Sequence, residues 1–170
     1  MIKYNSELRY GITLLDEVTI RKKAEVSGED TYEFISAVCN HFIRNPDPMI
    51  VPIYNFRLLE RPKSLFGTFR YHYDMMRLGM LEIGERFLIT RMVNVHSSKW
   101  DNDQYIAEIM DKQTPLFNFI KEVIDRGGYN DLHQGNVMKD EQERYRLIDL
   151  ESFANSRYPL EHHTNNWISR

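Results

Sequence analysis

Residues 127–153 form the most informative segment of the chain, with the sequence GGYNDLHQGNVMKDEQERYRLIDLESF. Residues 137–138 and 145–148 have the apolar, β-branched character of two short strands, and the polar residues between them predict a turn. Asp131 and Asn136 precede the first strand, and Asp149 follows the second. Because a hairpin brings its two ends together, we expect these three side chains to converge on one spot.

Residue chemistry alone leaves three interpretations of this cluster open. Asp149 and Asn136 could bind Mg²⁺ through oxygen atoms, while Asp131 orients or deprotonates a hydroxyl, as phosphoryl transfer requires. His133 could instead join the aspartates at a transition metal, although no second histidine lies near it in sequence. The third interpretation is that Asp and Asn only stabilise turns by local hydrogen bonds.

The bulk composition indicates an ordinary globular chain. Its 170 residues are 42% apolar, which suits one domain or two very small lobes. The net charge of −3 gives no basic field for nucleic acid, so no nucleic-acid partner is expected. The single cysteine, Cys39, excludes an internal disulfide framework and suits a reducing, cytoplasmic setting. No signal peptide or membrane span is evident, and we expect no membrane partner.

The first half of the chain predicts a small antiparallel sheet that carries one helix. Residues 8–25 are typical of a hairpin, and residues 49–60 and 68–78 of two further strands. Between them, Ser27 or Asp30 could cap a helix whose apolar face is expected to contain Phe34, Ala37, Val38 and Phe42.

The second half predicts helices up to residue 126. Segments 81–93 and 98–112 have near-helical apolar spacing, and Thr114-Pro115 is a typical start for another helix, which Gly127-Gly128 would end. Gly79 lies near the change of pattern. The predicted class is therefore α+β, with one lobe over residues 1–78 and a reduced helical lobe over residues 79–170.

The motifs YNDLHQGNVM and RLIDLE resemble the catalytic and metal-binding loops of the protein-kinase-like superfamily. They are most similar to its aminoglycoside-phosphotransferase-like and atypical microbial branches, and to a kinase carried by some tailed phages. The order along the chain also resembles that family in outline over nearly its whole length: strands with one helix come first, then further helices, then the polar loop. The motif-level resemblance is confined to residues 127–153.

The resemblance implies a two-lobed kinase-like fold that uses ATP and Mg²⁺. Asp131 matches the catalytic aspartate, and Asn136 and Asp149 match the metal ligands. The expected adenine-binding hinge covers residues 74–78 and includes Met75 and Met76. The segment VTIR places Arg21 where the family has a phosphate-binding lysine. Because the strand alternates, Lys23 would share its face, and either residue could be this cation.

The helix then supplies Glu33 as the expected partner of this cation. His133 is expected to orient the loop. Besides the ambiguous lysine position, two further departures from the family are evident: the glycine-rich phosphate loop is missing, and few residues follow Phe153. Substrate recognition is therefore expected to involve the cleft, the tail or a partner, and a homodimer is possible.

The expected function is a cytoplasmic phosphotransferase, in the host cytoplasm if a phage encodes it. It would act on a protein Ser/Thr hydroxyl or, as an alternative, on a small-molecule hydroxyl. A pseudokinase, or a kinase-shaped binding or inhibitory module, is the alternative from another class.

Overall fold

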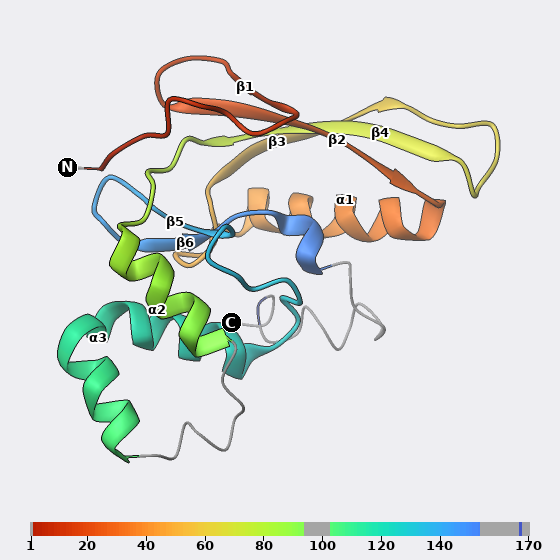
Figure 1. Ribbon diagram of the computed structural model, residues 1–170. Helices are drawn as coiled ribbons and strands as arrows, with labels where there is room; N and C mark the ends of the chain where they lie inside the picture. Colours follow the sequence, from red (N-terminus) through yellow and green to blue (C-terminus); the bar gives the residue numbers. More distant parts are fainter. Residues whose placement is uncertain (1, 94–102, 154–166, 168–170) are drawn as a thin grey trace.

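The computed structural model describes residues 2–93, 103–153 and 167, with the backbone alone for residues 103–114. Over these residues it is an α+β structure with a four-stranded antiparallel sheet, three α-helices and a separate two-stranded hairpin (Figure 1). This confirms the predicted class. Within the described residues, none of the helices combines the length and apolar character needed to cross a membrane.

The large sheet has the strand order β1-β2-β4-β3. Its strands are β1 (Ile12–Leu14), β2 (Thr19–Ser27), β3 (Ile53–Glu60) and β4 (Thr68–Met76). The predicted hairpin and both later strands are therefore present, although the first strand is only three residues long. Strand β4 has one face of core residues, as its alternation predicted: Phe69, Tyr71, Tyr73 and Met75.

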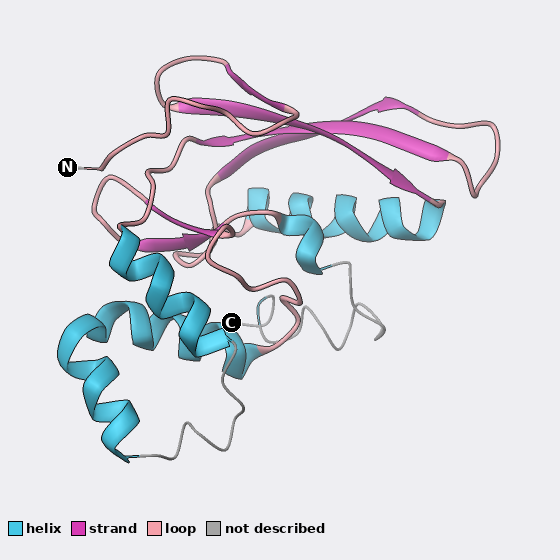
Figure 2. Ribbon diagram, viewed as in Figure 1, coloured by secondary structure: helices cyan, strands magenta, loops and turns pink. Residues whose placement is uncertain are grey.

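Helix α1 (Glu29–Arg44) lies against one face of this sheet (Figures 1 and 2). Its buried residues are Tyr32, Ile35, Val38, Cys39 and Phe42. Cys39 is a core residue as expected, but Ala37 is exposed because the buried stripe is centred one position away from the predicted one. Gly28 occupies the N-cap without a side-chain hydrogen bond, so the predicted Ser27 or Asp30 cap is wrong.

The helical part contains α2 (Ile83–Val93) and α3 (Asp103–Arg126). The predicted helix start at Thr114-Pro115 is wrong, because α3 continues through Pro115. The proline lacks one backbone N–H donor, and the helix accommodates this loss. Residues 98–102 of the predicted helix 98–112 lie outside the described part of the chain.

The polar segment forms the predicted hairpin, made of β5 (Val137–Lys139) and β6 (Tyr145–Leu147). A short 3₁₀-helix, η2 (Leu150–Phe153), follows at once. Isolated bridges join Ile50 to Leu147 and Gly79 to Lys139, so the hairpin is fastened to the chain on both sides of β3 and β4. These contacts hold the end of β6 close to the inner face of the large sheet.

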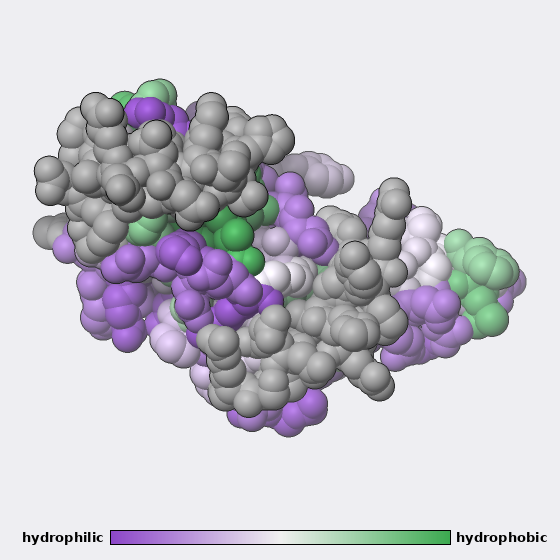
Figure 3. All heavy atoms as spheres, turned by 90° about the horizontal axis from the view of Figure 1, so that it is seen from below, coloured by the Kyte–Doolittle hydropathy of each residue, from purple (hydrophilic) through white to green (hydrophobic). Residues whose placement is uncertain are grey.

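The surface seen from below is mostly hydrophilic where residues are described (Figure 3). A hydrophobic end lies over the loop between β3 and β4, which exposes Leu65 and Phe66.

Candidate active site

The loop before β5 folds back on itself around Asn136. This asparagine is buried, and its side-chain amide donates to the backbone carbonyl of Asp131 at 2.9 Å and to Asp149 Oδ2 at 3.5 Å. Its backbone carbonyl accepts from the N–H of Ile148 at 3.0 Å. Asn136 therefore joins the loop before the hairpin to the residue after it, as the sequence predicts.

Asp149 has a left-handed backbone, with φ of 58°. This conformation is uncommon for residues other than glycine and often occurs at functional sites. It lets the Ser152 N–H bond to the Asp149 carbonyl at 3.0 Å, while Asp149 Oδ1 accepts from Lys22 Nζ, also at 3.0 Å. Burial alone would raise the pKa of Asp149, but the charge and the hydrogen bond of Lys22 hold that pKa below its usual value.

The side chain of Asp131 is 56% exposed. His133 Nε2 lies 3.5 Å from Asp131 Oδ2, and His133 Nδ1 accepts from the Gly135 N–H at 3.0 Å. The second bond requires an unprotonated Nδ1, so Nε2 is the nitrogen that carries a proton toward the aspartate. The structure thus gives His133 the loop-orienting contacts that were expected of it.

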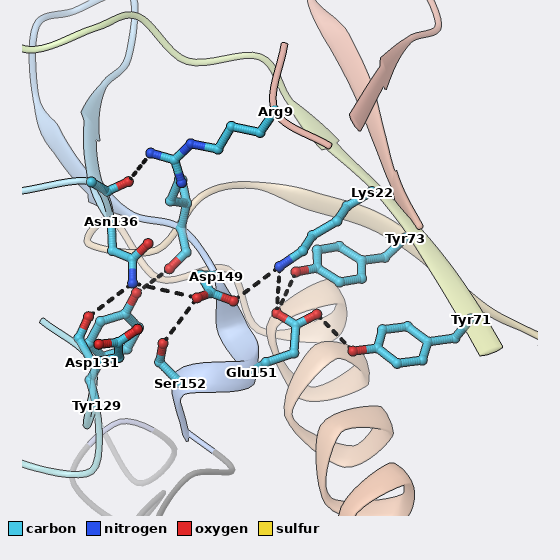
Figure 4. A network of polar contacts seen from close by, with 12 residues as sticks. Arg9, Lys22, Tyr71, Tyr73, Tyr129, Asp131, Asn136, Asp149, Glu151 and Ser152 are labelled. Carbon is cyan, nitrogen blue, oxygen red and sulfur yellow. Dashed lines mark hydrogen bonds and ion pairs between the residues drawn. The ribbon is translucent and has the colours of Figure 1, made fainter. Parts of the chain in front are cut away.

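Lys22 on β2 is a cation that contacts Asp149, one of the three residues predicted to converge (Figure 4). Its Nζ lies 3.0 Å from Asp149 Oδ1 and 2.9 Å from Glu151 Oε2. Burial would lower the pKa of Lys22, but the charges of Glu151 and Asp149 outweigh it, so this pKa is raised. Lys22 is therefore a fixed positive charge at neutral pH.

Glu151 accepts hydrogen bonds from Lys22 and from two tyrosines of the sheet (Figure 4). Tyr71 OH donates to Glu151 Oε1 at 2.8 Å, and Tyr73 OH donates to Oε2 at 2.9 Å. Burial, followed by the charge of Glu151, raises the pKa of both phenols, so they remain protonated donors. Three donors from the sheet thus meet one carboxylate from η2.

A cavity of about 290 Å³ opens beside this cluster, close to the lower end of the size range of small-molecule sites. Its charged lining residues include Lys22, Asp149, Glu7, Arg77 and Arg86. Apolar residues supply most of the remaining wall, among them Ile12, Ile20, Val137, Met138 and Ile148. The expected hinge also contributes, through Met75, Met76 and Leu78. An apolar pocket with a few convergent charged groups is typical of a ligand site.

Leu78 of the expected hinge lines the cavity. Pro52 O accepts from the Met76 N–H at 2.9 Å, and Gly79 exchanges hydrogen bonds with Lys139. Between them, the N–H and C=O of Leu78 have no hydrogen-bond partner among the described residues. Such a free donor and acceptor pair can bind the edge of a planar heterocycle.

The structure places the other sequence candidates away from this cavity. Arg21 lies on the opposite side of β2, where Nε is 2.7 Å from Asp74 Oδ1 and Nη2 donates to Asp74 Oδ2 at 3.0 Å. Lys23 follows Lys22 on the strand and is exposed on that same outer side. Glu33 is exposed on α1 rather than directed at Lys22. The buried face of α1 carries apolar residues there, so Glu151 takes the position expected of Glu33.

Lys22 and Glu151 are thus the residues that the sequence interpretation missed. A signal for Lys22 was present, because Ile20, Ala24 and Val26 share its face of the strand and mark it as the inward one. Glu151 lies two residues after the predicted metal ligand, but its tyrosine partners come from a strand about 80 residues earlier, which no local pattern connects.

The donor set fits Mg²⁺ in number and kind. Asn136 Oδ1 has no hydrogen-bond partner among the described residues, and Asp149 supplies a carboxylate oxygen nearby. No group of three or more His, Cys, Asp or Glu side chains suited to a metal occurs in the part of the chain that the structure describes. Mg²⁺ commonly takes only one or two protein ligands and completes its shell with water and phosphate oxygens.

Comparison of the sequence with protein-family models finds no match, and a search of curated proteins finds none either.

Proposed function

We propose that the chain is an ATP- and Mg²⁺-dependent phosphotransferase with a small, two-lobed, kinase-like fold. One observation carries the proposal: the same cavity is lined by the half-buried Lys22 and by Asp149, to which Asn136 is hydrogen-bonded. A cation beside two oxygen ligands is the arrangement that positions and neutralises a polyphosphate.

In this proposal the nucleobase lies against Met75 and Met76, between the apolar side chains of Ile20 and Met138. Leu78 meets its edge with backbone groups. The phosphates extend toward Lys22, which contributes a fixed positive charge. Met75 and Met76 keep the role predicted for them, while Lys22 replaces Arg21 and Lys23.

Asn136 and Asp149 would hold Mg²⁺, which when bound neutralises phosphate charge and fixes the phosphate geometry. Asp131 is an exposed carboxylate whose backbone carbonyl accepts from the Asn136 amide, and it would accept or orient the proton of an incoming hydroxyl. His133 holds the Asp131 loop. The acceptor class that the sequence resemblance favours is a protein Ser/Thr hydroxyl, followed by a small-molecule hydroxyl.

A binding module without catalysis is the second candidate, and one contact favours it. Lys22 is bonded to Asp149 itself, at 3.0 Å, so the charges of the cluster are balanced without any ligand. In a pseudokinase this ion pair would serve the fold alone. In an enzyme, nucleotide and Mg²⁺ would compete for the same two side chains.

Incubation with γ-labelled ATP and Mg²⁺ tests the enzyme proposal through its division of roles. We expect wild-type protein to transfer label to a protein mixture or to a panel of small alcohols. Asp149→Asn should lose Mg²⁺-dependent nucleotide binding, whereas Asp131→Asn should keep binding and lose transfer. Asp125→Asn, an exposed carboxylate on α3, is the matched control. Wild-type transfer rates in either active-site variant would overturn the assignment, and nucleotide binding without any transfer would favour the pseudokinase.

A further inference from the structure

The N-terminal segment, residues 2–11, passes along the cavity and is fastened at both ends. Near its start, Lys3 O accepts from the Met80 N–H at 2.7 Å, and Asn5 O accepts from Arg77 at 3.2 Å. At its other end, Gly11 O accepts from the Lys23 N–H at 2.8 Å. Five residues of this segment line the cavity: Asn5, Glu7, Leu8, Arg9 and Tyr10.

Gly11 sets the direction of this segment. Its φ of 82° is readily adopted by glycine, and a Cβ at this position would lie 2.7 Å from the Lys23 carbonyl oxygen. The resulting turn leads from β1 back along the cavity, so the one glycine of the first hairpin forms a corner. It does not provide a run of backbone amides for phosphates.

Arg9 is the side chain that this turn brings to the cluster. It extends toward the loop that contains Asn136 and donates to the backbone carbonyl of Gly135 (Figure 4). No carboxylate pairs with Arg9 among the described residues, unlike Lys22, which has two. Arg77 and Arg86 also line the cavity. Arg9 and Lys22 differ from them in reaching the Asn136 loop and Asp149, through Gly135 and Asp149 respectively, and of these two only Lys22 has carboxylate partners among the described residues.

We propose that Arg9 is a second phosphate-binding cation of this site. When a nucleoside triphosphate is bound, the guanidinium leaves the Gly135 carbonyl and donates to phosphate oxygens beyond those that Lys22 contacts. This inference rests on the proposed function and adds to it a binding residue outside the predicted motifs. Residues 2–11 then do with one side chain what a glycine-rich loop does with backbone amides.

Three physical reasons support this exchange of partners. A guanidinium gains more from a charged phosphate than from a neutral carbonyl, because charge-assisted hydrogen bonds are the stronger kind. Its planar set of donors matches two phosphate oxygens at once. Arg9 is also exposed, so water can hydrate its guanidinium while it moves from the Gly135 carbonyl to a phosphate.

Calorimetric titration of the full chain with Mg²⁺ and ATP, ADP, AMP or adenosine tests the role of Arg9. We expect Arg9→Ala to weaken ATP binding by about ten- to a hundredfold, the loss of one or two charge-assisted hydrogen bonds, and to leave adenosine binding unchanged. Arg9→Lys should recover part of the loss, since it restores charge without the planar donors. Lys23→Ala removes an equal charge on the outer side of β2 and should bind ATP normally.

The outcomes separate this inference from the proposed function. Equal ATP affinity in wild type and Arg9→Ala, with both folded by circular dichroism, overturns the role of Arg9 and leaves the function standing. An equal loss of ATP and adenosine binding also overturns it, because the residue would then support only the cavity shape. Arg9→Gln, which keeps a donor for the Gly135 carbonyl, replaces Arg9→Ala if that variant does not fold. A wild-type protein that binds no nucleotide overturns both proposals.

Discussion

Replacing Glu151 by alanine should destabilise the fold more than any other single carboxylate change in the cluster. The substitution removes the acceptor of Tyr71, Tyr73 and Lys22 at once. Both tyrosines are almost completely buried, so their hydroxyls would lose a charged partner without gaining water.

The size of the effect follows from these contacts. A hydrogen bond to a charged group contributes about 1.5–3 kcal/mol, so the two phenols give roughly 3–6 kcal/mol as an upper range. The Glu151 side chain is 19% exposed, and water can partly replace it. Lys22 also keeps Asp149 as a partner. We therefore expect a loss of about 3 kcal/mol in the free energy of unfolding, a large part of the stability of an ordinary domain.

Urea denaturation of Glu151→Ala and Glu33→Ala measures this difference directly. Glu33 is the matched control, because it is exposed on α1 and should change stability by no more than about 0.5 kcal/mol. Glu151→Gln should lie between them, since its amide oxygen still accepts from one tyrosine. A larger loss in Glu33→Ala than in Glu151→Ala would refute the assignment of Glu151 as the partner of Lys22.

Two further predictions concern charges on either side of β2. Lys22→Met should weaken Mg²⁺-ATP binding at least about tenfold, as loss of one charge-assisted contact does, while Arg21→Met should leave binding within about twofold; the reverse order in a calorimetric titration would return the phosphate contact to Arg21. Burial, and then the charge of Arg21, lowers the pKa of His72, so the unfolded chain binds a proton as pH falls below about 6.5 while the folded chain does not. Stability should therefore fall from neutral pH toward acid, by at most about 1.4 kcal/mol per pH unit for this group, and the fall should be shallower in His72→Gln. Identical slopes in urea titrations of the two proteins would contradict this.

Much of the fold follows from local patterns. The alternation of β4, with aromatic residues on one side, predicts a strand with one buried face, and the structure has it. The polar segment also forms the predicted hairpin, because short apolar runs separated by a turn have few other ways to pair. Asn136 and Asp149 meet because hairpin geometry alone brings them together.

The side of β2 that faces the cavity was harder to predict. Alternation fixes which residues share a face, but three consecutive basic residues leave the choice of face to the neighbours. The apolar residues Ile20 and Ala24 determine which face is the inner one, because they pack inward on the same side as Lys22. Arg21 then lies on the outer side, where it pairs with Asp74. The VTIR pattern therefore indicated Arg21, one residue before Lys22, which is the residue that contacts Asp149.

The partner of the lysine could not be predicted from any local rule. Glu33 was expected to pair with the cation because it lies on the helix after β2, but α1 presents apolar side chains to the sheet instead. Glu151 depends on tyrosines from β4 and on the short helix η2, which meet only in the folded chain. The helix through Pro115 is likewise an outcome that local proline preferences argue against.

The central claim is that the cavity beside Lys22 and Asp149 binds a nucleotide through Mg²⁺. The most direct measurement is a calorimetric titration of the wild-type chain with ATP, in the presence and in the absence of Mg²⁺. We predict binding of one ATP per chain that requires Mg²⁺ and is lost in Asp149→Asn. No binding, or binding of equal strength without Mg²⁺ and in Asp149→Asn, would contradict the account.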